Sequence, residues 1–271
     1  MYDSAATPGP ELVITNPEPG VAVLTLNRPK ARNALSLGLI RLLHEAIASS
    51  GQDTGVAAIV IAANGPVFSA GHDLKELTAH RGDAGGGRAF FETTMQACAA
   101  LMQAIVACPK PVIAAVQGTA TAAGCQLVAT CDLAVAAETA EFGTPGVNIG
   151  LFCSTPMVAL ARNVPRKQAM EMLLLGETMS ATDAERFGLI NRAVPAGQVM
   201  DLALDMAGRI AAKSKATVAI GKQAFYRQID MPVGEAYDYA AKVMVENMMH
   251  ADANEGICAF IEKRAPLWKD S

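Results

Sequence analysis

The fold of this chain is decided by residues 110–148, which read KPVIAAVQGTATAAGCQLVATCDLAVAAETAEFGTPGVN. The run 112–116 is apolar and predicts a buried strand, and the small residues after it predict a tight turn. A helix is expected to open at residues 122–124, followed by a second strand at 133–136 and a glycine-containing loop. A strand, a helix and a strand in this order favour parallel pairing with a right-handed crossover.

The earlier stretch 67–75, VFSAGHDLK, has the same character, because a strand is followed by small residues that expose backbone N–H groups. Two such bends can form an oxyanion hole, in which main-chain donors hold the negative oxygen of an enolate or a tetrahedral intermediate. Where a carboxylic acid base would be expected beside them, the chain has Gln126 and Gly146. The sequence therefore predicts a stabiliser of negative charge without the usual acid and base.

Length and composition set the broad class of protein. The chain has 271 residues, of which 51% are hydrophobic and 18% charged, so it is long enough for one large domain, or one domain plus an appendage, with a sizeable core. Its formal net charge of −4 gives no electrostatic footprint for nucleic acid or an anionic membrane surface. No apolar stretch approaches the ~20 residues that a membrane-spanning helix needs. We therefore expect no nucleic acid and no membrane as partner.

Cysteine usage and the N-terminus bear on the cellular location. Five of the 6 cysteines lie inside apolar runs and there is no CxxC pair, which predicts reduced, buried thiols rather than a disulfide framework. The first residues, MYDSAATPGPE, show no basic region, no apolar run and no Arg-rich amphipathic pattern, so they predict no signal or transit peptide. We expect a cytoplasmic protein.

Turn signals and helical periodicity divide the chain. We expect a disordered leader over residues 1–10 and an α/β core over residues 11–195, which begins with a β-hairpin around Asn-Pro-Glu-Pro-Gly. Residues 196–271 are predicted to be helical, and their Met-rich apolar surface needs a partner, either the core or another subunit. The segment 81–87, RGDAGGG, predicts a flexible loop, either a mobile wall of a substrate pocket or a plain surface loop.

Several familiar kinds of site are not found in the sequence. The chain has no Walker A loop, no G-x-G-x-x-G after a strand and no G-x-S-x-G elbow. Its four histidines (His44, His72, His80 and His250) show no metal-ligand spacing. We therefore predict no metal site and no nucleotide-binding loop of these types.

Six separated blocks resemble the crotonase superfamily, that is, the enoyl-CoA hydratase/isomerase family. The resemblance covers nearly the whole chain and implies an α/β fold of the crotonase (ClpP-like) type, a spiral of ββα units with a C-terminal helical oligomerisation region. It also implies an acyl-CoA thioester as ligand, with coenzyme A as part of the substrate rather than a separate cofactor, and a homotrimer or a dimer of trimers. The blocks are LNRPKARNAL at 26–35, FSAGHDLK at 68–75, KPVIAAVQG at 110–118, GCQL at 124–127, CDL at 131–133 and AFIEKR at 259–264.

Carried over by position, the resemblance implies the residues of the site. The oxyanion donors would be the backbone N–H groups of His72 and Ala123, the second at a helix start, where the helix dipole favours negative charge. For the charged members of the coenzyme A site, an ordinary solvated surface is the alternative. The implied coenzyme A contacts are Lys30, Ala31, Arg32, Ala70, Asp73, Leu74 and Lys75, with Phe260 and Lys263 from a neighbouring subunit.

The chain departs from the hydratases of the family at both acid–base positions. One of their glutamates follows the Gly-Cys of the second donor helix, where this chain has Gln126, and the other follows the proline of the next loop, where Gly146 follows Pro145. An amide cannot accept a proton near pH 7, although it can position water or a carbonyl, and glycine has no side chain. Each missing group costs roughly 10²–10⁴-fold in rate, so efficient hydration by the usual route is not expected.

Another residue could replace the missing groups. Glu92 and Glu141 are the candidate carboxylates, and for each the simpler interpretation is a surface or structural residue. The His72 side chain could be a base, a coenzyme A contact or a solvent-facing passenger, and a donor-loop side chain usually points away from the reacting carbon. Cys153 could act as a nucleophile only with a depressed pKa and a nearby base.

The sequence thus predicts a crotonase-fold enzyme that stabilises a thioester enolate, with weak or non-hydratase activity. Isomerisation, decarboxylation and thioester hydrolysis could each use the hole with fewer side-chain catalysts. A non-catalytic acyl-CoA-binding protein is an alternative from another class, and it predicts binding without turnover. RNA binding, a property of one relative in the superfamily, is not expected, because the helix at 33–50 offers Arg41 as its only cation besides His44.

Overall fold

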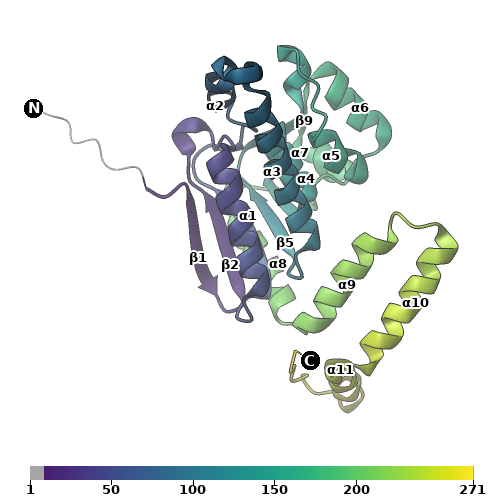
Figure 1. Ribbon diagram of the computed structural model, residues 1–271. Coiled ribbons are helices and arrows are strands. Elements are labelled where there is room, and N and C mark those ends of the chain that lie inside the picture. Colours follow the sequence, from purple (N-terminus) through teal and green to yellow (C-terminus); the bar gives the residue numbers. More distant parts are fainter. Residues whose placement is uncertain (1–8, 271) are drawn as a thin grey trace, which may run out of the picture.

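Two β-sheets form the core of the protein in the computed structural model, which describes residues 9–270 (Figure 1). The larger sheet has the strand order β1-β2-β3-β5-β7-β10, in which β1 is antiparallel to β2 and every other pair is parallel. Its inner strands are buried and apolar on both faces, which is typical of parallel strands that helices cover on both sides. The strands are β1 (Leu12–Glu18), β2 (Val21–Leu26), β3 (Ala58–Ala63), β5 (Val112–Val116), β7 (Leu133–Ala137) and β10 (Arg192–Val194).

The smaller sheet gives the core its spiral. Each of β3, β5 and β7 is followed by a three-residue strand of the second sheet and then by one or more helices, so the chain repeats a ββα unit three times. The second sheet keeps the same spatial sequence, β4-β6-β8, and β9 is added antiparallel to β8. The predicted spiral of ββα units is therefore confirmed. The short strands are β4 (Val67–Ser69), β6 (Thr119–Thr121), β8 (Glu141–Gly143) and β9 (Thr178–Ser180).

Helices cover the sheets, and their starts follow from local capping chemistry. The Ser36 hydroxyl accepts a hydrogen bond from Leu39 N–H at 3.2 Å and begins α1, as the sequence predicts. Helices α1 and α3 pack against each other, while α8 lies against β3, β5 and β7. The helices of the core are α1 (Leu37–Gln52), α2 (Leu74–Ala79), α3 (Arg88–Ala107), α4 (Ala123–Thr130), α5 (Pro156–Asn163), α6 (Arg166–Leu175), α7 (Ala181–Phe187) and α8 (Val199–Ala211).

The last three helices form an arm that stands away from the sheets (Figure 1). They are α9 (Lys215–Gln228), α10 (Val233–Met249) and α11 (Ala251–Glu262). None of the helices within residues 9–270 has the length and hydrophobicity needed to cross a bilayer. The arm nevertheless exposes large apolar side chains that a single chain leaves uncovered, including Phe225, Val233, Tyr237, Met244, Val245, Met248, Met249 and Phe260.

The fold differs from the sequence-based expectation in several places. The short helices α2 and α5 and the strands β6 and β9 were not predicted. Helix α8, predicted to belong to the helical region 196–271, packs on the large sheet, so the core extends past residue 195. Residues 81–87 form a 3-10 turn, His80–Gly82, followed by a turn with left-handed glycines. The His80 ring stacks on Phe90 with ring centroids 3.6 Å apart, and Gly85, Gly86 and Gly87 all have positive φ. Residues 1–8 of the predicted leader lie outside the described residues. Pro10, its last residue, accepts a hydrogen bond from the Asn27 side chain at 2.9 Å.

Candidate functional site

The first donor bend follows β4 and is built around Gly71. The glycine has a φ of 86°, which side-chain-bearing residues rarely adopt. Its carbonyl accepts from Leu35 N–H at 2.7 Å, and Asp73 N–H donates to the Leu35 carbonyl at 3.1 Å. These two bonds flank His72, whose own N–H donates no hydrogen bond within residues 9–270. The bend therefore offers one free main-chain donor.

A buried asparagine that the sequence did not single out supports this bend. Asn33 is fully buried at a φ of 49°, and its amide donates to the carbonyls of Asn64 at 2.9 Å and Val67 at 2.7 Å. Its main-chain carbonyl accepts from the Ser69 hydroxyl at 2.9 Å. Asn33 thus ties the loop after β2 to both ends of β4. The only sequence signal was its place inside the block at 26–35.

Asp73 closes the bend and begins α2. Its carboxylate accepts from the N–H groups of Lys75 and Glu76 at 3.1 and 3.2 Å, and from the Arg28 guanidinium at 3.0 Å. Burial acts to raise the pKa of Asp73, but the bonds from Glu76 N–H and Arg28 outweigh it and lower the pKa. The carboxylate is already engaged inside the chain, so its predicted contact with coenzyme A stays a prediction.

The second donor bend lies between β6 and α4. Ala122 has φ 49° and ψ −120°, an unusual conformation for a residue other than glycine, and its N–H donates to the Gly143 carbonyl at 2.8 Å. Helix α4 begins at Ala123, whose N–H has no acceptor in the part of the chain that the structure describes. Gly124 then allows the helix to approach β4, because a Cβ there would lie 2.7 Å from the Ser69 Cβ.

The two bends meet at Gly71. A Cβ at this position would lie 2.8 Å from the Ala122 Cβ and 3.1 Å from the Ala123 nitrogen, so only a glycine permits the approach. The structure therefore brings the two predicted donors, His72 and Ala123, into one place from bends about fifty residues apart in the sequence. Two free main-chain N–H groups in one place, one of them at a helix start, are an arrangement that can hold a developing oxyanion.

Gln126, one of the two positions where the hydratases have glutamate, lies one turn into α4. Its side chain is buried, with 4% of the residue exposed, and its Oε1 is 4.0 Å from the Cys98 Sγ, a weak sulfur hydrogen bond. Among the described residues, no cationic side chain makes a hydrogen bond with it. The side chain is neutral, and it can orient a polar group but not remove a proton.

Gly146, the other position, lies in the 3-10 turn Pro145–Ile149, and the space beside it is filled. A Cβ on Gly146 would lie 2.8 Å from both the Cys153 Sγ and the Leu151 carbonyl oxygen. The Gly146 carbonyl also accepts from Leu151 N–H at 2.9 Å. The following loop has therefore closed onto the place that a glutamate side chain would need, which the sequence did not reveal.

The titratable groups considered as possible catalysts are poorly suited to that role. Burial lowers the pKa of His72 to about 4, so its imidazole is neutral at pH 7 and a weak base, and its Nε2 has no partner among the described residues. Burial raises the pKa of Cys98 to about 12 and also raises that of Cys153. Glu92 is exposed and pairs with Arg88 at 3.1 Å, and Glu141 is exposed at the start of β8.

The coenzyme A residues predicted from the resemblance fall into two groups. The 3-10 turn Pro29–Ala31 lies beside the first bend, because Ala70 N–H donates to the Arg32 carbonyl at 3.0 Å. Lys30, Arg32 and Lys75 are exposed there, which leaves three cations available to phosphate groups. This part of the prediction, comprising Lys30, Ala31, Arg32, Ala70, Asp73, Leu74 and Lys75, is brought together by the structure.

Phe260 and Lys263 form the second group and lie far from the first. Phe260 is on α11 and is 85% exposed, and Lys263 follows the helix with a φ of 55°. Figure 1 shows α11 at the end of the molecule opposite to α2, so these residues do not reach the two bends of their own chain. Their assignment to a neighbouring subunit remains a prediction.

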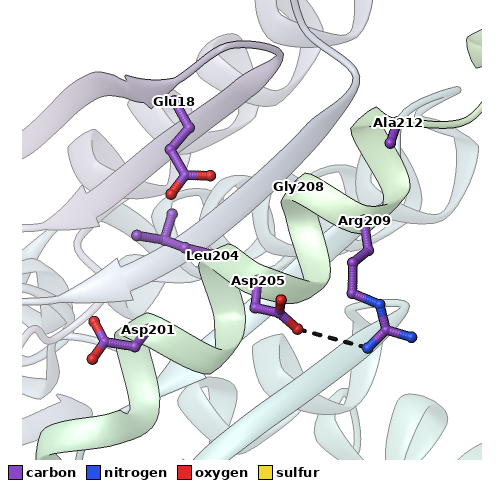
Figure 2. A pocket seen from close by; sticks show the side chains of 7 residues that line it. All are labelled: Glu18, Asp201, Leu204, Asp205, Gly208, Arg209 and Ala212. Carbon is purple, nitrogen blue, oxygen red and sulfur yellow. Dashed lines mark ion pairs between the residues drawn. The ribbon is translucent and has the colours of Figure 1, made fainter.

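An open pocket lies elsewhere, on the side of α8 that faces the β1–β2 turn (Figure 2). None of the residues of the candidate site lines it. Glu18, Asp201 and Asp205 make it acidic, and Arg209 pairs with Asp205 at 3.6 Å. An acidic lining repels the phosphates of coenzyme A, so this pocket is not a candidate thioester site.

Comparison with known proteins agrees with the fold. A profile of the enoyl-CoA hydratase/isomerase family matches residues 16–271. The mitochondrial enoyl-CoA hydratase domain-containing protein 3 of Rattus norvegicus is 47% identical over 269 residues, covering 98% of this chain and 88% of the relative. The crystal structure of an enoyl-CoA hydratase from Mycobacterium smegmatis superposes with a TM-score of 0.91 at 50% identity, covering 96% of this chain and 99% of the other.

The crystal structure of human enoyl-CoA hydratase domain-containing protein 3 gives the same TM-score of 0.91, at 45% identity, covering 96% of this chain and all of the other. The cytoplasmic location predicted from the sequence is contradicted, because the rat, mouse and human relatives at 47% identity are named as mitochondrial proteins. The predicted resemblance to the crotonase superfamily is confirmed. The chain belongs to the enoyl-CoA hydratase/isomerase family.

Proposed function

We propose that this protein is an enzyme that binds an acyl-CoA thioester and stabilises its enolate between the N–H groups of His72 and Ala123. The observation that carries the proposal is the meeting of two main-chain donors, both without an acceptor in residues 9–270, at bends that touch through Gly71. The negative oxygen would accept from both and lie at the start of α4, where the helix dipole favours it.

Efficient hydration of an enoyl thioester does not fit this site. Adding water to the double bond needs one group to activate the water and a group to protonate the neighbouring carbon. Gln126 is a neutral amide, and the space beside Gly146 is occupied by Leu151 and Cys153. We therefore expect hydratase activity to be weak or absent.

The sequence left isomerisation, decarboxylation and thioester hydrolysis open. Of these, decarboxylation is favoured by the absence of a base. When a thioester carries a carboxylate on its α carbon, loss of CO₂ moves the electron pair of the broken C–C bond into the carbonyl. The oxygen then becomes the enolate oxygen, with no proton removed by the protein. The α carbon afterwards takes a proton from water, and the resulting hydroxide combines with CO₂ as bicarbonate, which balances the reaction.

Binding of the coenzyme A part rests on exposed cations and on a second copy of the chain. Lys30, Arg32 and Lys75 surround the first bend and can pair with phosphate oxygens. Because α11 is too distant to serve its own site, Phe260 and Lys263 would serve the site of a neighbour. A head-to-tail contact of this kind forms a ring when its rotation closes, and we propose the ring that the family resemblance implies, a homotrimer, alone or as a dimer of trimers.

A substrate panel tests the function. Crotonyl-, malonyl- and 3-hydroxyacyl-CoA are assayed for turnover, and binding is measured by calorimetry. We expect binding of CoA esters, slow or no hydration of crotonyl-CoA, and CO₂ release from the malonyl-type ester. Hydration of crotonyl-CoA near the diffusion limit would refute the interpretation of Gln126 and Gly146. Binding without turnover of any ester would favour the non-catalytic alternative, and no binding at all would refute the proposal.

A matched pair of variants tests the oxyanion hole itself. Gly71→Ala places a Cβ 2.8 Å from the Ala122 Cβ and should separate the two bends, while Gly197→Ala adds a methyl group where no atom lies within 4 Å. Loss of an oxyanion donor costs about 10²–10³-fold in kcat. We expect that loss in Gly71→Ala and none in Gly197→Ala. Equal turnover in the two variants would mean that the bends do not hold the reacting oxygen.

A further inference from the structure

A buried lysine joins the arm to the core. Lys222 lies in α9, and 6% of its side chain is exposed. Its ammonium group donates to the carbonyl oxygens of Ile105 at 2.9 Å and Lys110 at 3.0 Å, and to the Asp132 carboxylate at 2.6 Å. All three of its protons therefore have acceptors, on segments that precede β5 and β7.

Asp132 is the centre of this cluster. Its side chain is 15% exposed, and besides Lys222 it accepts from Val112 N–H at 2.7 Å and from the Tyr226 hydroxyl at 2.9 Å. Tyr226 lies one turn beyond Lys222 on the same helix. We call Lys222, Tyr226 and Asp132 the α9 anchor. It joins one face of α9 to the edge of the large sheet where β5 and β7 begin.

The rest of the arm has few polar contacts with the core. Within the described residues, α10 makes no hydrogen bond or ion pair with any residue before Ser214. Elsewhere in the arm, Lys215 donates to the Thr54 carbonyl at 2.8 Å, and Trp268 donates to the Ala212 carbonyl at 2.9 Å. The α9 anchor is thus the buried polar attachment of an otherwise projecting structure (Figure 1).

The chemistry of the anchor is better suited to orienting the arm than to stabilising the fold. A buried ion pair often contributes no more to stability than apolar side chains of the same size, because both charges lose their hydration. Its hydrogen bonds, in contrast, fix directions. The arm leaves the core at Ser214, and α10 returns along α9, since the Asn247 amide donates to the Thr217 hydroxyl at 3.4 Å. A change in the direction of α9 therefore turns the whole arm about Ser214.

We propose that the α9 anchor is a positioning element, which sets the angle at which the arm presents Phe260 and Lys263 to the CoA site of a neighbouring copy. This inference rests on the proposed function, in which α11 completes that site. Hydrogen bonds weaken steeply away from their preferred distance and angle, so a change in the direction of the arm weakens contacts to the nucleotide end of coenzyme A. The acyl end, held at His72 and Ala123, is unaffected.

The test uses a variant that removes both charges, Lys222→Met/Asp132→Asn, because Lys222→Met alone leaves a buried unpaired carboxylate and can fail to fold. The matched control is Gln223→Met, at an exposed position of the same helix whose side chain makes no hydrogen bond within the described residues. Spin labels are placed on the exposed positions Glu45 in α1 and Lys242 in α10 of full-length protein with Cys258→Ser. Dilution with unlabelled protein isolates distances within one chain.

We expect the distance distribution to broaden at least twofold in the double variant and to stay unchanged in the control. The Kd for an acyl-CoA should rise at least tenfold in the double variant, and the Kd for the matching acyl-pantetheine, which lacks the nucleotide, should not change. An unchanged distribution, or an equal loss for both ligands, overturns the proposal. If wild-type protein binds neither ligand, the proposed function fails, whereas the distance measurement still shows whether the anchor orients the arm.

Discussion

Replacing Gly146 by alanine should destabilise the protein, because the loop after it leaves no room for a methyl group. The added Cβ would lie 2.8 Å from the Cys153 Sγ and 2.8 Å from the Leu151 carbonyl oxygen, well inside van der Waals contact. Relief requires movement of Leu151, whose N–H donates to the Gly146 carbonyl. Overpacking of this kind typically costs about 1–3 kcal/mol of unfolding free energy.

Thermal unfolding at fixed protein concentration measures the effect. For a chain of this size, about 2 kcal/mol lowers Tm by about 4–8 °C. Gly197→Ala is the matched control, since nothing lies within 4 Å of a Cβ at that position and its φ is not positive. The double variant Gly146→Ala/Cys153→Ala should recover part of the loss, because it removes the sulfur and leaves the Leu151 carbonyl.

Equal Tm values for Gly146→Ala and Gly197→Ala would refute the reasoning, since they would show that the loop yields without cost. The same crowding predicts that introducing glutamate at 126 and 146 together does not create an efficient hydratase. The second carboxylate could be accommodated only by displacing Leu151 and Cys153, which would move it away from the geometry of a working acid–base pair.

Three further changes give measurable outcomes. Gln126→Glu buries a carboxylate with no cationic partner, and burial raises the pKa of this carboxylate in the folded state. The stability of the variant relative to wild type should therefore fall as pH rises above about 4.3, the ordinary pKa of glutamate. The decrease in Tm relative to wild type should be larger at pH 8 than at pH 5. Asn33→Ala leaves buried carbonyls without donors and should cost about 3 kcal/mol in urea unfolding, against less than about 0.5 kcal/mol for the exposed Asn254→Ala. Hydrogen bonds from Arg264 lower the pKa of Glu255 from 4.5 to about 2. The contribution of Glu255 to folding stability is therefore present above pH 4.5 and lost as pH falls toward 2. The fluorescence of Trp268, the one tryptophan, should change in that pH range.

Much of the fold could be predicted from the sequence because strong local signals agree with the tertiary structure. The run at Val112–Val116 is apolar and buried, and Ser36 caps α1 as its side chain chemistry predicts. The second sheet was only partly visible, since strands such as Thr119–Thr121 have three residues and too little periodicity to read. Helix α5, which begins at Pro156, follows a loop whose small and polar residues masked it.

The candidate site, like the fold, could be predicted from the sequence only in part. His72 and Ala123 could be located because their bends carry small residues in recognisable blocks, and the structure brings these bends together. The support from Asn33 and the closure of Leu151 onto Gly146 could not be predicted. Both depend on which carbonyls and sulfur atoms arrive from distant segments, and that is a property of packing rather than of local sequence.

The meeting of the two bends at Gly71 has an evolutionary consequence. Since every residue except proline carries a backbone N–H, other substitutions at His72 or Ala123 that keep the bend also keep the donors. The two main-chain donors are therefore inherited with the fold, and the side chains around them are free to diverge. A lineage could lose one reaction at Gln126 and Gly146 and acquire another while the same pair of donors persists. The positions that tolerate no drift are instead the small residues that let the bends touch, Gly71 and Gly124.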